Sequence, residues 1–157
     1  MNLQITPAPV RKSIHVRAAP ERAFKVFTGD MTRWWRPDHH IGDAPLKAVV
    51  LEHHVGGRWH EINTDGSECE WGKVLVWEPP HRVVLAWQLN GEWKYDPDFI
   101  TELEVRFIPD QAGTRVELEH RNIENFDTRA DQVRASLDSP EGWSGGLASF
   151  AALAEAA

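Results

Sequence analysis

TELEVRFIPDQAGTRVELEHR, residues 101–121, is the stretch that decides the kind of sheet this chain builds. Apolar side chains recur at every second position within its two halves, at Leu103, Val105, Phe107, Val116 and Leu118. Charged residues occupy most of the positions between them. This period of two is typical of half-buried strands with one solvent-exposed face. Ala112-Gly113 supplies the turn. We therefore predict two antiparallel strands, over 100–108 and 114–121.

The residues before this hairpin predict four more strands. Their patterns cover 47–54, 57–62, 68–77 and 82–89. Gly56-Gly57, Asp65-Gly66 and Pro79-Pro80 separate them and provide the backbone freedom or fixed φ that tight turns need. Connections this short imply an antiparallel meander. Asp96-Pro97 interrupts the last interval, so we interpret residues 90–98 as a loop.

Both ends of the chain combine a strand or helix pattern with proline signals. A strand is expected over 10–18, followed by a helical pattern that starts at Pro20 and ends before Pro37. At the other end, Ser139 is expected to cap a helix with Pro140 in its first turn. The apolar stripe of that helix is Trp143, Leu147, Phe150 and Ala154.

Two glycines interrupt the predicted C-terminal helix. Gly145 and Gly146 would each cost about 1 kcal/mol relative to alanine in a helix interior. We expect a close approach of the helix backbone to the sheet, or to a ligand, to offset that cost.

Composition limits the class of protein. The 157 residues fit one domain, 1–157, and contain 41% hydrophobic and 26% charged residues, as globular proteins do. The formal net charge of -7, without a Lys/Arg cluster, argues against nucleic-acid binding. No apolar run has the length of a membrane span, the N-terminus lacks a secretory signal, and Cys69 is the only cysteine. These features favour a cytoplasmic location.

The order of elements predicts an α+β helix-grip fold. In this fold a curved antiparallel sheet of about seven strands wraps around a long C-terminal helix, with two short helices after the first strand. Three stretches then resemble the Aha1-like family, relatives of the activator of the Hsp90 ATPase, within the START/Bet v 1-like superfamily. They are VGGRW at 55–59, WGKVLVWEPPHRVVLAW at 71–87, and the pair GTRVELEH at 113–120 with GWSGGL at 142–147. The resemblance covers about residues 10–155.

This resemblance implies a cavity between sheet and helix that holds a hydrophobic small molecule. Lipid-transfer domains, hormone binders and polyketide cyclases belong to the same superfamily, so the fold alone does not select a chemistry. The co-chaperone role of the family belongs to a eukaryotic protein with an additional N-terminal domain. This chain resembles the stand-alone members instead.

Aromatic residues supply most of the candidate site. The chain has eight tryptophans, and an indole in a small domain serves as core, pocket wall or interface. Core packing is the plain interpretation for any single one, whereas the set favours a pocket wall. His53 occupies a position where the family tends to carry an apolar residue. The predicted ligand-binding residues are Trp35, His53, Trp59, Glu61, Trp87, Phe107, His120 and Trp143.

Two polar members of that set have alternative interpretations. Strand parity turns His120 inward, where it would orient or protonate a ligand or would simply be a structurally satisfied histidine. Glu61 shares the parity of Trp59. Burial would raise the pKa of Glu61 toward values useful for acid–base chemistry, unless the residue lies at a solvated strand end.

Metal and nucleophile chemistry have little support. The pairs His39-His40 and His53-His54 lack the spacing of a metal motif, because neighbouring strand residues point to opposite faces. Cys69 has no activating neighbour, and no nucleotide-binding glycine motif is present. We expect neither a metal nor a cofactor.

Three functional hypotheses remain open. The first is a non-enzymatic binder of a hydrophobic or aromatic small molecule. The second is a cyclase- or hydrolase-type enzyme that uses Glu61 or His120 as acid or base. The third is a protein-interaction module that acts through a sheet face or a dimer interface, and a large exposed apolar patch, for example at Trp93 and Tyr95, would favour it.

Overall fold

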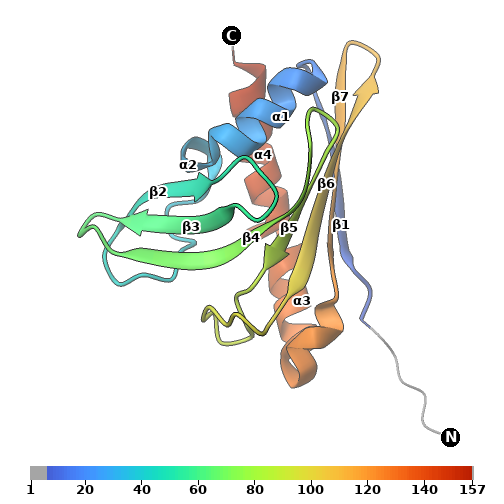
Figure 1. The fold of residues 1–157 in the computed structure, drawn as a ribbon. Coiled ribbons are helices and arrows are strands. Elements are labelled where there is room, and N and C mark those ends of the chain that lie inside the picture. The colour runs from blue at the N-terminus through green and yellow to red at the C-terminus, as the bar shows by residue number, and fades with distance from the viewer. Residues whose placement is uncertain (1–6, 157) are drawn as a thin grey trace, which may run out of the picture.

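The computed structural model describes residues 7–156, and within them seven strands form one antiparallel sheet in the order β1-β7-β6-β5-β4-β3-β2 (Figure 1). The strands are β1 Val10–Val16, β2 Leu46–Leu51, β3 Arg58–Asn63, β4 Glu68–Glu78, β5 Arg82–Trp87, β6 Thr101–Asp110 and β7 Gly113–Arg121. The predicted meander is confirmed, with β1 added beside β7. Residues 1–6, part of the stretch used to judge a signal sequence, lie outside the described residues.

The register of β6 and β7 agrees with the predicted alternation of buried and exposed residues. Val105 lies opposite Leu118, and Phe107 lies opposite Val116. All four side chains are buried. On the outer face, Glu104 accepts hydrogen bonds from Arg82, Arg106 and Arg121. The sheet therefore has the buried face and the charged face that its period of two requires.

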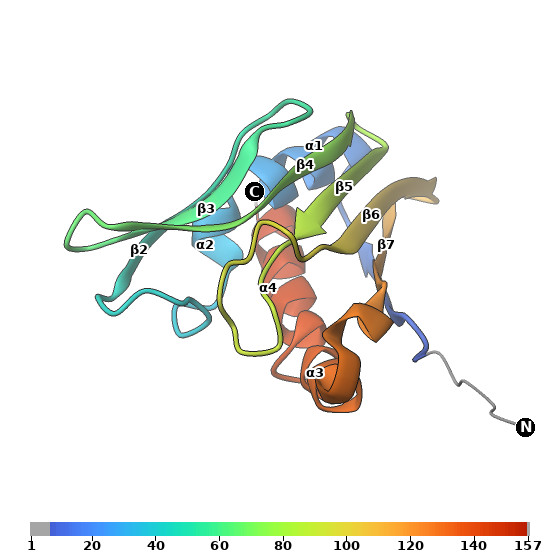
Figure 2. The same ribbon diagram turned by 60° about the horizontal axis from the view of Figure 1, so that its bottom comes forward.

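The helices complete an α+β helix-grip fold. Two short helices follow β1, and a helical segment over 123–155 closes the concave side of the sheet (Figure 2). The first pair lies at one end of α4 and α3 lies at the other (Figure 1). The bounds are α1 Pro20–Gly29, α2 Met31–Trp34, the 3-10 helix η1 Ile123–Arg129, α3 Ala130–Asp138 and α4 Trp143–Glu155.

The predicted start of the C-terminal helix is wrong. Helix α4 begins at Trp143 with Gly142 as its N-cap, whereas Ser139 ends α3, a helix that the sequence analysis did not predict. Ser139 Oγ donates to the carbonyl of Ser136 at 2.7 Å. A proline disfavours the helical conformation in the residue before it. Ser139-Pro140 therefore ends one helix here and does not begin another.

The glycine pair in α4 does not face the sheet. A Cβ on Gly146 would lie 3.7 Å from the ring of Trp34 in α2, and a Cβ on Gly145 would lie 2.6 Å from the carbonyl oxygen of Pro140. Only Gly145 is in a close approach, to the turn before α4; the distance at Gly146 is ordinary van der Waals contact, and the expected close approach to the sheet is not found.

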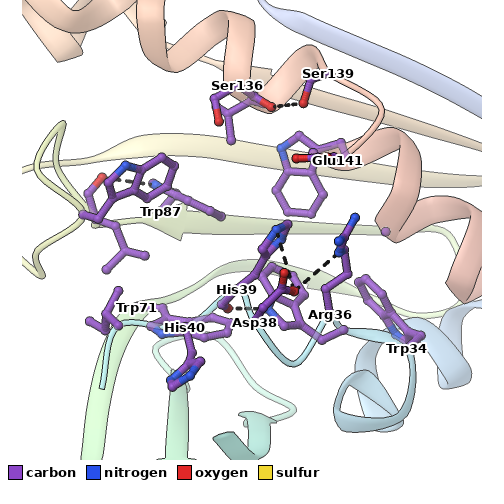
Figure 3. Close-up of a pocket in the computed structure, with 18 residues that line it drawn as sticks. Trp34, Arg36, Asp38, His39, His40, Trp71, Trp87, Ser136, Ser139 and Glu141 are labelled. Atoms are coloured by element: carbon purple, nitrogen blue, oxygen red, sulfur yellow. Dashed lines mark hydrogen bonds and ion pairs between the residues drawn. The ribbon is translucent and has the colours of Figure 1, made fainter. Parts of the chain in front are cut away.

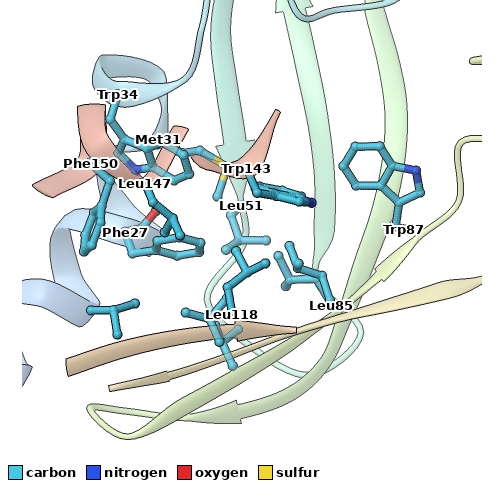
Figure 4. Close-up of a cluster of buried hydrophobic side chains, with 14 of the residues drawn as sticks. Phe27, Met31, Trp34, Leu51, Leu85, Trp87, Leu118, Trp143, Leu147 and Phe150 are labelled. Atoms are coloured by element: carbon cyan, nitrogen blue, oxygen red, sulfur yellow. Dashed lines mark hydrogen bonds between the residues drawn. The ribbon is translucent and has the colours of Figure 1, made fainter. Parts of the chain in front are cut away.

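The core fills the space between α1, α2, α4 and the sheet (Figure 4). Phe27 lies 5.4 Å from Phe150 and 5.8 Å from Phe107 between ring centroids, both in edge-to-face arrangements. Trp34 joins the same cluster and donates its indole N–H to the carbonyl of Phe27 at 3.2 Å. In the described part of the chain no helix is long and apolar enough to cross a membrane.

Candidate functional site

A cavity of about 310 Å³ opens beside the first turn of α4 (Figure 3). Its walls come from the end of α2 and the loop after it, from β4 and β5, from the loop at 89–93, and from the turn between α3 and α4. Helix α2 ends at Trp34, and Trp35 is already extended, with φ -70° and ψ 142°. The chain is thereby turned across the concave face of the sheet.

Tryptophans form most of the wall. Six of the eight line the cavity, namely Trp34, Trp35, Trp71, Trp87, Trp93 and Trp143. Trp35 is central to this wall, with ring centroids 4.9 Å from Trp71 and 5.8 Å from Trp143. Trp87 lies 5.8 Å from Trp143 on the other side. Tilted and edge-to-face indole pairs add stabilisation beyond area burial and hold one another in place.

Three of the eight predicted site residues line the cavity, and two others lie elsewhere. Trp35, Trp87 and Trp143 belong to the wall. Phe107 belongs to the core beside Phe24 and Phe27. His53 is exposed in the loop between β2 and β3 and stacks on Trp77 with ring centroids 5.1 Å apart, and it does not line this cavity.

The remaining three predicted residues, Trp59, Glu61 and His120, form a buried layer directly behind the wall. The side chain of Trp59 is buried between the rings of Trp35, Trp71 and Trp87. Glu61 and His120 are fully buried; Glu61 reaches the cavity residue Trp71 through a hydrogen bond, and His120 both packs against the rings of Trp87 and Trp143 and accepts a hydrogen bond from Trp143.

Glu61 anchors the loop that forms one side of the cavity. Its carboxylate accepts the backbone N–H of Ile41 at 2.7 Å and of Gly42 at 3.1 Å, and the indole N–H of Trp71 at 2.8 Å. His40 Nδ1 lies 3.2 Å from the same carboxylate. The expected rise in pKa is wrong: burial does act to raise the pKa of Glu61, but these N–H donors outweigh it and lower the pKa.

His120 takes part in a hydrogen-bonded chain that joins α4 to the sheet. The indole N–H of Trp143 donates to His120 Nδ1 at 3.2 Å, so the proton of the neutral ring is on Nε2. That nitrogen donates to Thr101 Oγ1 at 2.8 Å. Burial lowers the pKa of His120 to about 3. The arrangement matches a structurally satisfied histidine.

Polar side chains gather in the loop after α2. Arg36, Asp38, His39 and His40 line the cavity, and Glu141 lines it from the turn before α4. From the sequence, the pair His39-His40 is considered only as metal ligands and is not expected in the pocket. The sequence feature that could have identified these residues is a charged segment directly after a pair of tryptophans. In residues 7–156 no group of three or more His, Cys, Asp or Glu side chains is placed to hold a metal ion.

The fold and this cavity define a helix-grip protein with a cavity between sheet and C-terminal helix. The family profile described as Activator of Hsp90 ATPase homolog 1-like protein matches residues 17–155, and the chain belongs to this family. No curated protein matches the sequence.

Solved structures share the fold. The anthrahydroquino-gamma-pyrone synthase Txn09, complexed with SUM, is 38% identical with a TM-score of 0.66, over 94% of this chain and 97% of that one. The self-sacrificing resistance protein CalC from Micromonospora echinospora is 32% identical with a TM-score of 0.70, over 94% of each chain. The Aha1 dimer from Colwellia psychrerythraea, 17% identical with a TM-score of 0.61 over 95% and 97%, shares the fold.

Proposed function

We propose that this protein binds a planar aromatic small molecule in the tryptophan-lined cavity. The observation that carries the proposal is the wall itself, since six indoles surround a volume of about 310 Å³. Ligand pockets are mostly apolar, with a few placed polar groups, and commonly start at about 300 Å³. The cavity therefore suits a compact ligand of a few fused rings.

The wall favours an aromatic ligand over an acyl chain. Only Ile41, Leu89 and Leu137 contribute aliphatic side chains to the lining. Indole rings attract other π-systems through offset stacking and edge-to-face contacts, which an alkyl chain does not offer. The charged side chains of the loop after α2 lie at the same cavity and suit hydroxyl or carbonyl groups on the edge of such a ligand.

One of the reported structures supports the same class of ligand. The synthase at 38% identity is named for an anthrahydroquino-gamma-pyrone, which is a fused-ring aromatic compound. The ligand of the present chain is proposed by chemical class only.

Titration of the intrinsic tryptophan fluorescence with 1,8-dihydroxyanthraquinone tests the proposal. We expect saturable quenching, because the ligand would stack against several indoles at once, and no saturable change with decanoic acid. Trp93→Ala should weaken binding about tenfold, the equivalent of about 1.4 kcal/mol. Tyr95→Ala is the matched control, since both residues are exposed in the same loop and only Trp93 lines the cavity. Equal binding by the two variants, or quenching that never saturates, would contradict the proposal.

The enzyme hypothesis needs residues other than those first considered. Glu61 and His120 lie behind the wall, and their polar atoms are engaged by the protein. This placement argues against either one as the acid or base.

A protein-interaction role and a cytoplasmic location stay predictions. Val55, Trp93 and Tyr95 are the large apolar side chains exposed within the described residues. Sedimentation of the wild-type protein and of Tyr95→Ala would show whether this surface joins two copies.

A further inference from the structure

We propose that His39 is a general acid–base group toward the ligand in this cavity, with Asp38 as its positioning residue. The inference rests on the proposed function, because it needs a planar aromatic ligand bound against the tryptophan wall. It goes beyond binding, since it assigns proton transfer to His39, a residue that the acid–base hypothesis drawn from the sequence did not include.

The side chains of the loop after α2 form a charged row at the cavity. Figure 3 shows the ring of His39 beside the carboxylate of Asp38, with the guanidinium of Arg36 on the other side of that carboxylate. His39 Nε2 lies 4.0 Å from Asp38 Oδ1, and Arg36 Nε lies 3.5 Å from the same oxygen. All three residues line the cavity.

The backbone of His39 is held at both of its polar groups. Its N–H donates to the carbonyl of Arg36 at 3.0 Å, and its carbonyl accepts the indole N–H of Trp35 at 2.8 Å. Farther along the loop, Glu61 holds the N–H groups of Ile41 and Gly42. The imidazole therefore projects from a backbone that is fixed before any ligand enters, which is what acid–base catalysis requires of its groups.

A carboxylate beside one imidazole nitrogen has a defined effect on the other. When the Asp38 carboxylate accepts a hydrogen bond from Nε2–H, the Nδ1 lone pair is left free to accept a proton, and the carboxylate stabilises the imidazolium that forms. The separation of 4.0 Å is longer than a hydrogen bond. Catalytic hydrogen bonds in ligand-free proteins are often long and shorten when substrate binds.

The substrate class follows from these groups. It is a planar aromatic ketone that carries a hydrogen on an enolisable carbon. His39 takes that proton, and the C–H electron pair forms a new C=C bond; where an aromatic ring separates this carbon from the carbonyl, the ring π bonds shift in turn, and the carbonyl π pair moves onto oxygen, which gives an aromatic enolate. Return of the proton to carbon or to oxygen completes an exchange or a tautomerisation. No oxidant, reductant or second substrate is needed, and the positive charge of Arg36 favours the enolate.

Anthrone is the probe, because it is a flat tricyclic ketone with enolisable hydrogens at C10. The wild-type protein is incubated with anthrone in deuterated buffer under argon, and the loss of the C10 hydrogen signal is followed by proton NMR. We expect exchange to be at least tenfold faster than in buffer, since a positioned acid–base group typically contributes 10²–10⁴-fold. His39→Gln should remove most of that acceleration, and His81→Gln, at an exposed turn outside the cavity, should retain it.

Asp38 is tested through its coupling to His39. Asp38→Asn should slow exchange about three- to tenfold in the wild-type background and should have no further effect in the His39→Gln background. A purely structural role for Asp38 would lower both rates alike. Glu141→Gln covers the other carboxylate that lines the cavity, and loss of exchange in this variant with full exchange in His39→Gln would overturn the assignment.

Fluorescence titration with anthrone on the same samples separates the two proposals. Anthrone that binds but exchanges no faster than in buffer, or equally fast with His39→Gln, overturns the acid–base role and leaves the proposed function intact. Failure of the wild-type protein to bind both anthrone and 1,8-dihydroxyanthraquinone overturns both. Binding retained in His39→Gln together with lost exchange is the result that supports the inference.

Discussion

Two titratable side chains lie directly behind the tryptophan wall, and their surroundings keep one of them ionised and the other neutral. Glu61 accepts several N–H donors, which lower its pKa and keep it ionised. His120 lies among apolar groups with one donor and one acceptor, which keeps it neutral. Each therefore acts as a fixed partner for a cavity tryptophan, Glu61 for Trp71 and His120 for Trp143.

His120 should make the folded state sensitive to mild acid. Its pKa is about 3 in the folded protein against an ordinary 6.5, so the unfolded chain binds a proton between these values and the folded one does not. The free energy of unfolding should therefore fall as pH is lowered below about 6.5, by up to about 1.4 kcal/mol per pH unit. Urea denaturation between pH 7 and pH 5 measures this slope. It should flatten in His120→Gln and persist in His81→Gln, and equal slopes in both variants would contradict the prediction.

Glu61→Gln should loosen the cavity loop. The side-chain amide group would face N–H donors instead of accepting from them, so we expect a loss of about 2 kcal/mol in the free energy of unfolding. Amide hydrogen exchange at Ile41 and Gly42 should accelerate beyond the global change. Glu92→Gln, whose carboxylate makes only an exposed ion pair 3.8 Å from Lys94, is the control with little expected effect. Unchanged protection of Ile41 would show that the loop is held by other contacts.

At the scale of elements, α4 has two different ends. Its first turn, with Trp143 and Gly146, belongs to the cavity, whereas Phe150 and Ala154 lie in the core. Helix α1 and helix α2 pack on the core end, with Phe27 and Trp34 against Phe150. The packing of the C-terminal half of α4 in the core thus fixes the position of its first turn, which forms part of the cavity wall.

Removal of the core anchor of α4 should therefore cost much stability. Phe150 is fully buried, and Phe150→Ala should reduce the free energy of unfolding by about 3–5 kcal/mol through lost burial and a residual cavity. Ser149→Ala, one residue away and exposed, should change it by less than about 0.5 kcal/mol. Guanidinium denaturation of both variants measures the difference. Similar midpoints would mean that α4 is not held by its core end.

Elements whose pattern depends on local sequence were predictable. The alternation from Leu103 to Leu118 settles a buried face by parity alone, and the register of β6 and β7 follows it. Helix α3 was missed because its apolar stripe is short, with only Ala130, Val133 and Leu137 buried. The Ser139-Pro140 signal is ambiguous in sequence, since the same pair suits the start of one helix or the end of another.

At the scale of the whole molecule, the cavity joins segments that are far apart in sequence. Trp35, Trp87 and Trp143 come from a loop, a strand and a helix, and they meet only when the sheet has curved around α4. The prediction that these three tryptophans converge depended on the expected helix-grip fold and not on any local sequence pattern. The placement of Glu61 and His120 behind the wall could not be predicted, because strand parity gives the face of a side chain but not its depth or partners.

A bound ligand should consequently stabilise the whole fold. At a free concentration of 100 times Kd it adds about 2.7 kcal/mol to the free energy of unfolding, and for a chain of this size that corresponds to a rise in Tm of about 5–10 °C. Calorimetry with 1,8-dihydroxyanthraquinone measures the shift. Trp93→Ala should show a smaller shift than Tyr95→Ala at the same ligand concentration, and the absence of any shift would count against binding in the cavity.

The interlocked tryptophans also have an optical consequence. Trp35 and Trp71 are 4.9 Å apart with their planes inclined at 40°, and Trp35 and Trp143 are 5.8 Å apart at 78°. Chromophores held at such distances and angles share their excited states, so the far-ultraviolet circular dichroism should contain a split exciton band. That band would disappear when the wall comes apart, even if the sheet survives, and would change sign or shape when a flat chromophore enters. The exciton band would thus report directly on the integrity of the tryptophan wall and on its occupancy.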